Sequence, residues 1–235
     1  MRWRTIGVIG GMGPAATADF LARLVVAAQA PQDTDHPRVL VDSNPQVPDR
    51  NAARQGRGPS PGPVLAAMAQ RLVASGAQVL AMPCNAAHGW AADVVAATGA
   101  DFVHMVDAAV AEALATGART IGIIAIGATL DARLYHDRLA AAGLRTIDCD
   151  RSIVQPLVNA IKAGDTGPGV QAAMAAEAAR LVAAGAETVI AACTEVPLVL
   201  AQNAVTVPFV DATAALVRAT LQAARKPGFD AHKNR

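Results

Sequence analysis

Two fourteen-residue stretches, RLVASGAQVLAMPC at residues 71–84 and RLVAAGAETVIAAC at residues 180–193, are near-copies of each other. They agree at seven of fourteen positions, and each ends on a cysteine. Each has the pattern of a helix end, a glycine turn and an apolar strand. The chain therefore places two of its three cysteines at the same point of a repeated unit.

The repeat extends beyond these two stretches. RTIGVIGG at 4–11 is echoed by RTIGIIAI at 119–126, and MVDAAVAEAL at 105–114 resembles FVDATAALVRATL at 209–221. The elements recur in the same order, at offsets of 115, 109 and 104 residues. A duplicated unit of just over 100 residues is the economical explanation.

Short apolar runs of strand length alternate with alanine- and leucine-rich segments of helix length. We expect strands near 5–10, 38–42, 78–83, 102–105, 120–125, 144–148, 187–192 and 206–209. We expect helices near 14–29, 63–75, 86–97, 107–116, 130–142, 152–163, 170–184 and 212–225. Apolar strands flanked by helices form parallel sheets covered on both faces. The predicted fold is α/β, with two pseudo-symmetric doubly wound lobes, each on a mainly four-stranded parallel sheet, and an active site in the cleft between them.

The repeat also predicts how the chain divides. The VDA sequences at 106–108 and 210–212 mark the points where the chain crosses between lobes. We expect an N-terminal lobe of residues 1–106 plus 212–228, which includes a returning C-terminal helix, a C-terminal lobe of residues 107–211, and a tail of residues 229–235.

The composition excludes several classes of partner. Of the 235 residues 53% are apolar, enough for a substantial core, while the net charge is +1 and aromatic residues make up 3%. These values give no basis for binding nucleic acid or an anionic membrane. The apolar run in MRWRTIGVIGGMGP breaks on glycines too early for a signal peptide, and no later stretch approaches the length of a membrane span. We therefore expect a cytoplasmic protein whose cysteines are thiols.

Both repeated cysteines follow a strand at the carboxyl edge of its sheet, where ligands bind in folds of this class. The long proline-rich segment 43–63 follows a strand at the same edge. If the lobes face each other, Cys84 and Cys193 approach one cleft from opposite sides. Such a pair suits a nearly symmetric reaction, in which one thiolate removes a proton from one face of a carbon and the other thiol returns a proton to the opposite face. Racemisation and epimerisation are reactions of this kind.

The residues after each cysteine bear on its reactivity. In PCNAAH and ACTEVP the sulfur stands just before an expected helix start, which lowers the pKa of a thiol. Asn85 and Thr194 are good helix caps and can equally donate hydrogen bonds to a carboxylate. The alternative is that Cys84 and Cys193 are both inherited core residues. Cys149 has no counterpart in the first half, and we expect it to be structural.

Two cofactor hypotheses compete with this one. Cys84, His88 and Cys193 can supply three zinc ligands, although tight structural sites usually have closer paired spacings. GMGPAA at 11–16 satisfies the G-x-G-x-x-A dinucleotide pattern after a strand, with Asp42 at the end of the next strand. The corresponding AIGATL of the second half lacks the full glycine pattern, and a turn that binds a small carboxylate or packs closely explains GGMGP as well.

A pyridoxal phosphate enzyme would need a Schiff-base lysine. The chain has only Lys162, Lys226 and Lys233, the last two in the tail. Lys162 stands in NAIKAGDTG, with no recognisable phosphate cradle beside it. We therefore expect no cofactor and no bound metal.

Six motifs together carry a family resemblance. They are GVIGGMGPAAT, SNPQVPDR, MPCNAAH, the IGAT–LY segment, IKAG and ACTEVPLVL. Their order and spacing, from about residue 5 to residue 213, resemble those of the aspartate/glutamate racemase family, and most closely those of its cofactor-independent aspartate racemases. Six linked motifs are far more specific than any one of them.

The resemblance implies that Cys84 and Cys193 are the catalytic thiols of a two-base amino-acid racemase that works as a homodimer. It implies that Arg50 and Lys162 recognise substrate carboxylates, a role for which the bidentate guanidinium of arginine is well suited. The predicted substrate-binding residues are Met12, Arg50, Asn85, Thr129, Lys162 and Thr194.

The chain departs from the family pattern around the expected α-carboxylate. Ala86 stands where the family has threonine after Cys-Asn, and Ile126 and Ala128 stand for threonine and glycine in the ATxGT pattern. The second cysteine lies in ACTE instead of GCTE. The thiols are untouched, but a change at a buried polar contact can shift discrimination between substrates by orders of magnitude.

Three further residues have open roles. His88 and Glu195 lie within a few residues of the thiols, and each either controls the protonation of its cysteine or braces its helix. His36 precedes the second strand and is expected to serve structure or an interface.

We predict an aspartate racemase or a racemase of a close acidic amino acid. The alternatives are an isomerase or decarboxylase of a related dicarboxylic acid on the same scaffold, and a non-catalytic protein that binds small carboxylates.

Overall fold

Eight strands form two parallel sheets in the computed structural model, which describes residues 3–225. The strands are β1 (Ile6–Gly10), β2 (Val39–Ser43), β3 (Val79–Ala81), β4 (Asp101–Val103), β5 (Thr120–Ile124), β6 (Arg145–Asp148), β7 (Thr188–Ala191) and β8 (Phe209–Asp211). They are ordered β2-β1-β3-β4 in the first sheet and β6-β5-β7-β8 in the second, and every pair is parallel. The predicted α/β fold with two similar lobes is confirmed.

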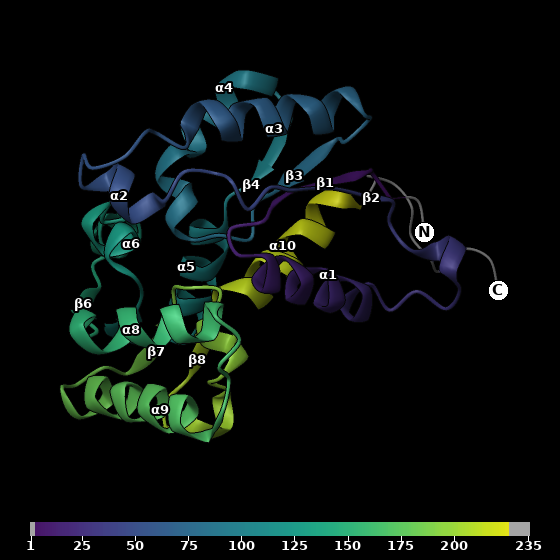
Figure 1. Ribbon diagram of the computed structural model, residues 1–235. Coiled ribbons are helices and arrows are strands. Elements are labelled where there is room, and N and C mark those ends of the chain that lie inside the picture. The colour runs from purple at the N-terminus through teal and green to yellow at the C-terminus, as the bar shows by residue number, and fades with distance from the viewer. Residues whose placement is uncertain (1–2, 226–235) are drawn as a thin grey trace.

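Helices follow the strands in both lobes (Figure 1). They are α1 (Pro14–Ala28), α2 (Arg50–Arg54), α3 (Gly62–Ala74), α4 (Ala91–Thr98), α5 (Met105–Ala115), α6 (Gly127–Asp131), α7 (His136–Ala141), α8 (Arg151–Lys162), α9 (Pro168–Ala183) and α10 (Ala212–Ala224). Short 3₁₀ turns are η1 (Asp33–Asp35), η2 (Ala86–Trp90), η3 (Val196–Leu198) and η4 (Gln202–Ala204).

Four expectations about these elements were wrong in detail. The helix expected at 86–97 begins with η2 and becomes α-helical only in α4, and the helix expected at 130–142 is split into α6 and α7. The strand expected at 206–209 is β8, which starts where the prediction ended. The segment 43–63 contains a helix, α2, that its composition did not predict.

The repeated sequences mark one repeated packing arrangement. Gly7 in β1 leaves room for Ala77 and Leu80, since a Cβ there would lie 2.7 Å from each. Gly122 is its counterpart in β5. A Cβ there would lie 3.1 Å from Ala186 and 3.2 Å from Leu181. β1 and β5 thus pack closely against the repeated stretches 71–84 and 180–193 through these glycines. This contact explains why the glycine-containing strand and the stretch recur together in each half.

The last helix of each half packs on the other half's sheet. Helix α5 follows β4 of the first sheet but contacts β7 and β8, whereas α10 follows β8 of the second sheet and contacts β3 and β4. Figure 1 shows α10 in yellow beside α1, and α10 packs against both α1 and α5. Asp211 caps α10 by accepting hydrogen bonds from two backbone amides and also pairs with Arg23 of α1. Each half thus contributes one helix to the other half's sheet, and the predicted lobe boundaries stay a prediction.

Two further expectations concern the chain ends and membranes. Residues 226–228 and the predicted tail at 229–235 lie outside the described residues. Among the described residues, no helix is both long enough and apolar enough to cross a bilayer.

Candidate active site

The two repeated cysteines occupy equivalent places in the two sheets. Cys84 follows β3 and Cys193 follows β7, and each of these strands is third in the order of its sheet. The two cysteines therefore lie at the carboxyl edges of their sheets. Both are buried, with 4% of the surface of Cys84 and 5% of that of Cys193 exposed. This placement is the one that the repeat predicted.

A buried tyrosine links the surroundings of the two thiols. The hydroxyl of Tyr135, between α6 and α7 of the second lobe, donates a hydrogen bond to Oδ1 of Asn85 in the first lobe. Burial raises the pKa of Tyr135, and the charge of a Cys193 thiolate adds to the increase, so Tyr135 lies within electrostatic reach of the second thiol. The phenol stays protonated and acts as a donor. Tyr135 therefore joins the second lobe to the residue that follows Cys84.

Cys193 is paired with a carboxylate. Its thiol donates to Oε2 of Glu195 at 3.0 Å, and the hydroxyl of Thr194 donates to the same oxygen at 3.1 Å. Burial raises the pKa of the Cys193 thiol well above its usual range, the negative charge of Glu195 adds to that increase, and Lys162 opposes it. The thiol therefore keeps its proton and donates it to Glu195 in a hydrogen bond.

The expected lowering of the Cys193 pKa by a helix N-terminus is wrong. The segment after Cys193 is only the three-residue turn η3, which has no helix dipole to speak of. The cap roles are also wrong: Asn85 precedes η2 without a side-chain cap bond, and Thr194 bonds to Glu195 instead of a helix amide.

His88 holds the backbone at Cys84. Its Nδ1 lies 2.8 Å from the carbonyl oxygen of Cys84, and the amide of Met105 donates to its Nε2 at 3.0 Å. An amide can only donate, so the proton of the ring lies on Nδ1. Burial, with a smaller contribution from His104, lowers the pKa of His88 to about 3. His88 is therefore a neutral brace, and its nitrogens do not face the thiol.

Because His88 is buried in its neutral form, the free energy of unfolding should decrease as the pH falls. The unfolded imidazole takes up a proton below about pH 6.5, which the folded one resists down to about pH 3. The stabilisation is complete above the unfolded pKa and declines as the pH falls, by about 2 kcal/mol between neutral pH and about pH 5. His88→Gln should be less stable at neutral pH but should lose about 2 kcal/mol less on acidification.

Urea unfolding of both proteins at the two pH values measures this difference. Equal losses in the two proteins would show that His88 is protonated in the folded state.

Helix α2 bridges the two lobes. It lies beside α6 at the left of Figure 1, and Oδ1 of Asn51 accepts a hydrogen bond of 2.7 Å from the amide of Ala128 in α6. Nδ2 of Asn51 donates to Gln155 of α8 at 3.2 Å. Arg50 is the first residue of α2, and its Nη1 donates to the carbonyl oxygens of Val47 and Pro48. Asn51 therefore fixes α2, and Arg50 with it, across the gap between lobes.

Three further predicted residues lie on the second-lobe side or in the glycine turn. Lys162 is the last residue of α8 and is exposed, close enough to affect the Cys193 pKa. Thr129 is buried in α6, and its Oγ1 has no hydrogen-bond partner among the described residues. Met12 is buried in the turn between β1 and α1.

The glycine turn is filled by the chain itself. A Cβ on Gly10 would meet the side chain of Thr17 at 2.5 Å, and one on Gly11 would meet the backbone of Asn44 at 2.4 Å. Asp42, the expected ribose ligand, is instead paired with Arg71 of α3 at 2.7 Å. These contacts favour close packing of the turn over a dinucleotide site.

The zinc hypothesis also fails on geometry. Both ring nitrogens of His88 are engaged by backbone groups, and residues 3–225 contain no cluster of three or more His, Cys, Asp or Glu that could hold a metal. Cys149 is buried, and its sulfur bonds to the backbone of Ala125, as a structural residue does. His36 precedes β2 and so lies at the amino end of the strands, away from the thiols.

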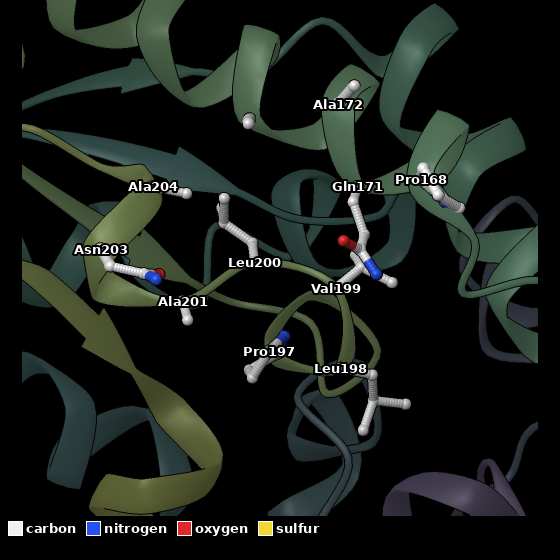
Figure 2. A pocket seen from close by; sticks show the side chains of 11 residues that line it. Pro168, Gln171, Ala172, Pro197, Leu198, Val199, Leu200, Ala201, Asn203 and Ala204 are labelled. Carbon is white, nitrogen blue, oxygen red and sulfur yellow. The ribbon is translucent and has the colours of Figure 1, made fainter.

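A cavity of about 550 Å³ lies elsewhere in the second lobe. Figure 2 shows it between the first half of α9, including Gln171, and the segment 197–204. Pro197 and Leu198 of its wall follow Glu195 by two and three residues, but none of the predicted site residues lines it.

Sequence reasoning gave no role to Tyr135 or Asn51. Tyr135 stands in the LY of a quoted motif, and Asn51 directly follows Arg50. Nothing in the sequence pattern indicated that either side chain crosses between lobes.

Comparison with known proteins places the chain among relatives of similar length. The family described as Asp/Glu/Hydantoin racemase matches residues 9–220. The chain is 25% identical to the broad specificity amino-acid racemase RacX of Bacillus subtilis, over 92% of this chain and 96% of RacX. A solved structure of Picrophilus torridus aspartate racemase is 26% identical, with a TM-score of 0.86 over 94% of each chain. Glutamate racemase of Francisella tularensis shares the fold, at 15% identity and a TM-score of 0.64, over 92% of this chain and 78% of its own.

Proposed function

Because the chain belongs to the Asp/Glu/Hydantoin racemase family, we propose that it racemises an acidic amino acid without a cofactor, using Cys84 and Cys193 as its two acid–base groups. One observation carries this proposal. Two buried cysteines end the third strand of two identically ordered sheets, and Tyr135 connects their surroundings across the lobes. A reaction that exchanges the two faces of a carbon needs one such group on each face.

The proton transfers follow from the pairing of Cys193 with Glu195. The thiol proton passes along its hydrogen bond to Oε2 of Glu195, from which it is released to solvent, and this leaves a thiolate. The thiolate takes the α-proton of the substrate, and the thiol of Cys84 protonates the carbanion from the other face. The Cys84 thiolate then regains a proton from solvent, which completes the cycle. In the reverse direction, Cys84 is the base and Cys193 the acid.

Two buried polar atoms without partners suit the substrate's α-carboxylate. Nδ2 of Asn85 and Oγ1 of Thr129 are buried, and neither has a partner among the described residues. Both can donate to a carboxylate, whose negative charge grows as the α-proton leaves. Arg50 and Lys162 bind the distal carboxylate in this scheme, with Met12 and Thr194 lining the site.

Aspartate is the first candidate substrate. RacX is named for broad specificity and the Picrophilus protein for aspartate. Ala86, Ile126 and Ala128 are all buried, so the departures from the family pattern lie inside the protein, where they can change the choice of substrate. A homodimer and a cytoplasmic location are proposed alongside this activity, with no nucleic-acid or membrane partner.

Chiral chromatography tests the function. The purified protein, free of pyridoxal phosphate, is incubated with each enantiomer of aspartate, glutamate and a panel of other amino acids. We expect the opposite enantiomer of an acidic amino acid to form. Turnover of dicarboxylic acids that lack an amino group would support the isomerase or decarboxylase alternative. Thermal stabilisation by such acids, with no turnover of any compound, would support a binding protein.

The bridge made by Asn51 should affect substrate binding. Asn51→Ala removes two hydrogen bonds that hold α2 and Arg50 over the cleft, each worth about 1 kcal/mol. We expect KM for the racemised amino acid to rise about 10-fold or more, with a smaller change in kcat. Asn203→Ala, at an exposed position on the cavity wall, is the matched control and should leave both constants unchanged. An unchanged KM in Asn51→Ala would show that α2 does not organise the site.

A further inference from the structure

Glu195 has one oxygen in use and one without a partner. Its side chain is buried, with 3% of its surface exposed. Oε2 accepts hydrogen bonds from Cys193 and Thr194, whereas Oε1 has no partner among the described residues. Glu195 also forms none of the ion pairs in the described part of the chain. A buried carboxylate oxygen with neither a donor nor a cation is costly, so a missing partner is expected.

The free oxygen faces the glycine turn of the other lobe. A Cβ built on Gly13 would lie 3.5 Å from Oε1, and no other atom of the described residues, Gly13 and its chain neighbours apart, would come within 4 Å of that Cβ. Gly13 follows Met12 directly. Oε1 of Glu195 is thus directed across the lobes toward the glycine turn, which is expected to line the substrate site. The other oxygen of Glu195 accepts a hydrogen bond from Cys193, a proposed catalytic thiol.

We infer that Oε1 of Glu195 binds the α-ammonium group of the substrate, and that the site therefore takes α-amino acids with a free amino group. This inference rests on the proposed function. An ammonium group supplies both the donor and the positive charge that Oε1 lacks. The unpaired atoms of Asn85 and Thr129, which the proposed function assigns to the α-carboxylate, are donors, so these two groups and Oε1 match the two charged ends of an amino acid.

This role also explains how one carboxylate serves two purposes. A bound ammonium group on Oε1 offsets the negative charge of Glu195, which adds to the effect of burial in raising the pKa of the Cys193 thiol. Oε2 still accepts the hydrogen bond of that thiol. A substrate without an ammonium group would leave Oε1 unpaired in a closed site. Discrimination against such compounds is expected to be strong, because a buried polar group left without its partner carries the full cost of desolvation.

The test compares ligands that differ only in the amino group. Binding of L-aspartate and succinate, and of L-glutamate and glutarate, is measured by isothermal titration calorimetry with the full chain. We expect the wild type to bind an amino acid about 10-fold or more tightly than its counterpart without the amino group. Glu195→Gln should weaken binding of the amino acid by about 10–100-fold and change binding of the counterpart by less than about threefold.

Two further variants separate this role from a structural one. Glu195→Asp keeps the charge and should retain part of the preference for the amino acid. Glu112→Gln, which removes a carboxylate paired with Arg218 on the outer helices, should retain all of it. Thermal melting establishes that each variant is folded.

Each outcome bears on one claim. If Glu195→Gln weakens binding of the amino acid and of its counterpart equally, or keeps the wild-type preference between them, the inference is wrong. Glu195 then acts on Cys193 alone. If the wild type turns over an amino acid but binds the counterpart equally well, the inference fails while the proposed function stands. If the wild type neither binds nor turns over any amino acid, the proposed function fails and the inference fails with it.

Discussion

Cys193→Ala is expected to lower the rate of racemisation by on the order of 10²–10⁴-fold, the usual contribution of a positioned acid–base group. Cys84→Ala should be as severe, because every turnover in either direction uses both thiols. Combining the two substitutions should add little further loss, since the residues act as a unit. The measurement is the initial rate from each enantiomer, with purified proteins of matched thermal stability.

Cys149 provides the matched control. It is as buried as the other two cysteines, but its sulfur bonds only to the backbone of Ala125, and burial raises its pKa to about 11. Cys149→Ser retains the donor and acceptor and should keep most of the activity. Full activity in Cys84→Ala or Cys193→Ala would refute the two-base scheme, and inactivity of all three variants would point to loss of structure instead.

Gly11→Ala should be among the most destabilising single substitutions in the chain. Gly11 has a φ of 94°, in the left-handed region that favours glycine. A Cβ there would lie 2.4 Å from two backbone atoms of Asn44, which follows β2. Because backbone cannot swing aside as a side chain can, we expect the free energy of unfolding to fall by about 4 kcal/mol or more. The turn that holds Met12 would be displaced as well.

Gly56→Ala is the control for this prediction. Gly56 also has a positive φ, of 69°, but within residues 3–225 nothing beyond its own chain neighbours lies within 4 Å of a Cβ built on it. Gly56→Ala should lower the free energy of unfolding by only about 1–2 kcal/mol, because alanine in the left-handed conformation is the only unfavourable change. Denaturant unfolding of both variants measures the difference. Similar losses in the two would show that Asn44 yields easily and that the glycine turn is not closely packed.

Much of the fold could be predicted because the duplicated motifs encode a repeated contact. Gly7 and Gly122 lie against the two RLVA–GA stretches, so the strands, the helices before them and their pairing recur together. The break between α6 and α7 could not be predicted this way. The chain turns at Arg133, which has a φ of 51° although it is not glycine, and no glycine or proline there signals the end of a helix.

That break has consequences for the site. It brings Tyr135 to Asn85, a contact between residues fifty positions apart that no spacing rule predicts. Helix α2 was missed for a different reason: five residues are too few to show a helical period, although Asp49 caps it by accepting from the amide of Ala52. The equivalent placement of the two cysteines could be predicted from the repeat alone, whereas the contact of Tyr135 with Asn85 joins segments far apart in the sequence.

The pairing at Cys193 shows the same limit. A cysteine before a helix start predicts a lowered pKa, and ACTEVP has that pattern. In the structure, burial of the thiol and the charge of Glu195 favour the protonated thiol, and the three-residue turn η3 supplies no helix dipole to oppose them. The second position after Cys84 is Ala86, so the two thiols have unlike partners despite the symmetric fold.

Deuterium incorporation tests the two-base mechanism most directly. Enantiomerically pure L-aspartate, or whichever acidic amino acid is racemised, is incubated with the protein in D₂O, and both enantiomers are isolated while little product has formed. With two bases, the acid thiol carries solvent deuterium. The D-product should then be deuterated at the α-carbon from the first turnovers, while the remaining L-substrate keeps its protium. Protium in the product, or equal deuteration of substrate and product, would contradict the account, because either result requires a single base that serves both faces.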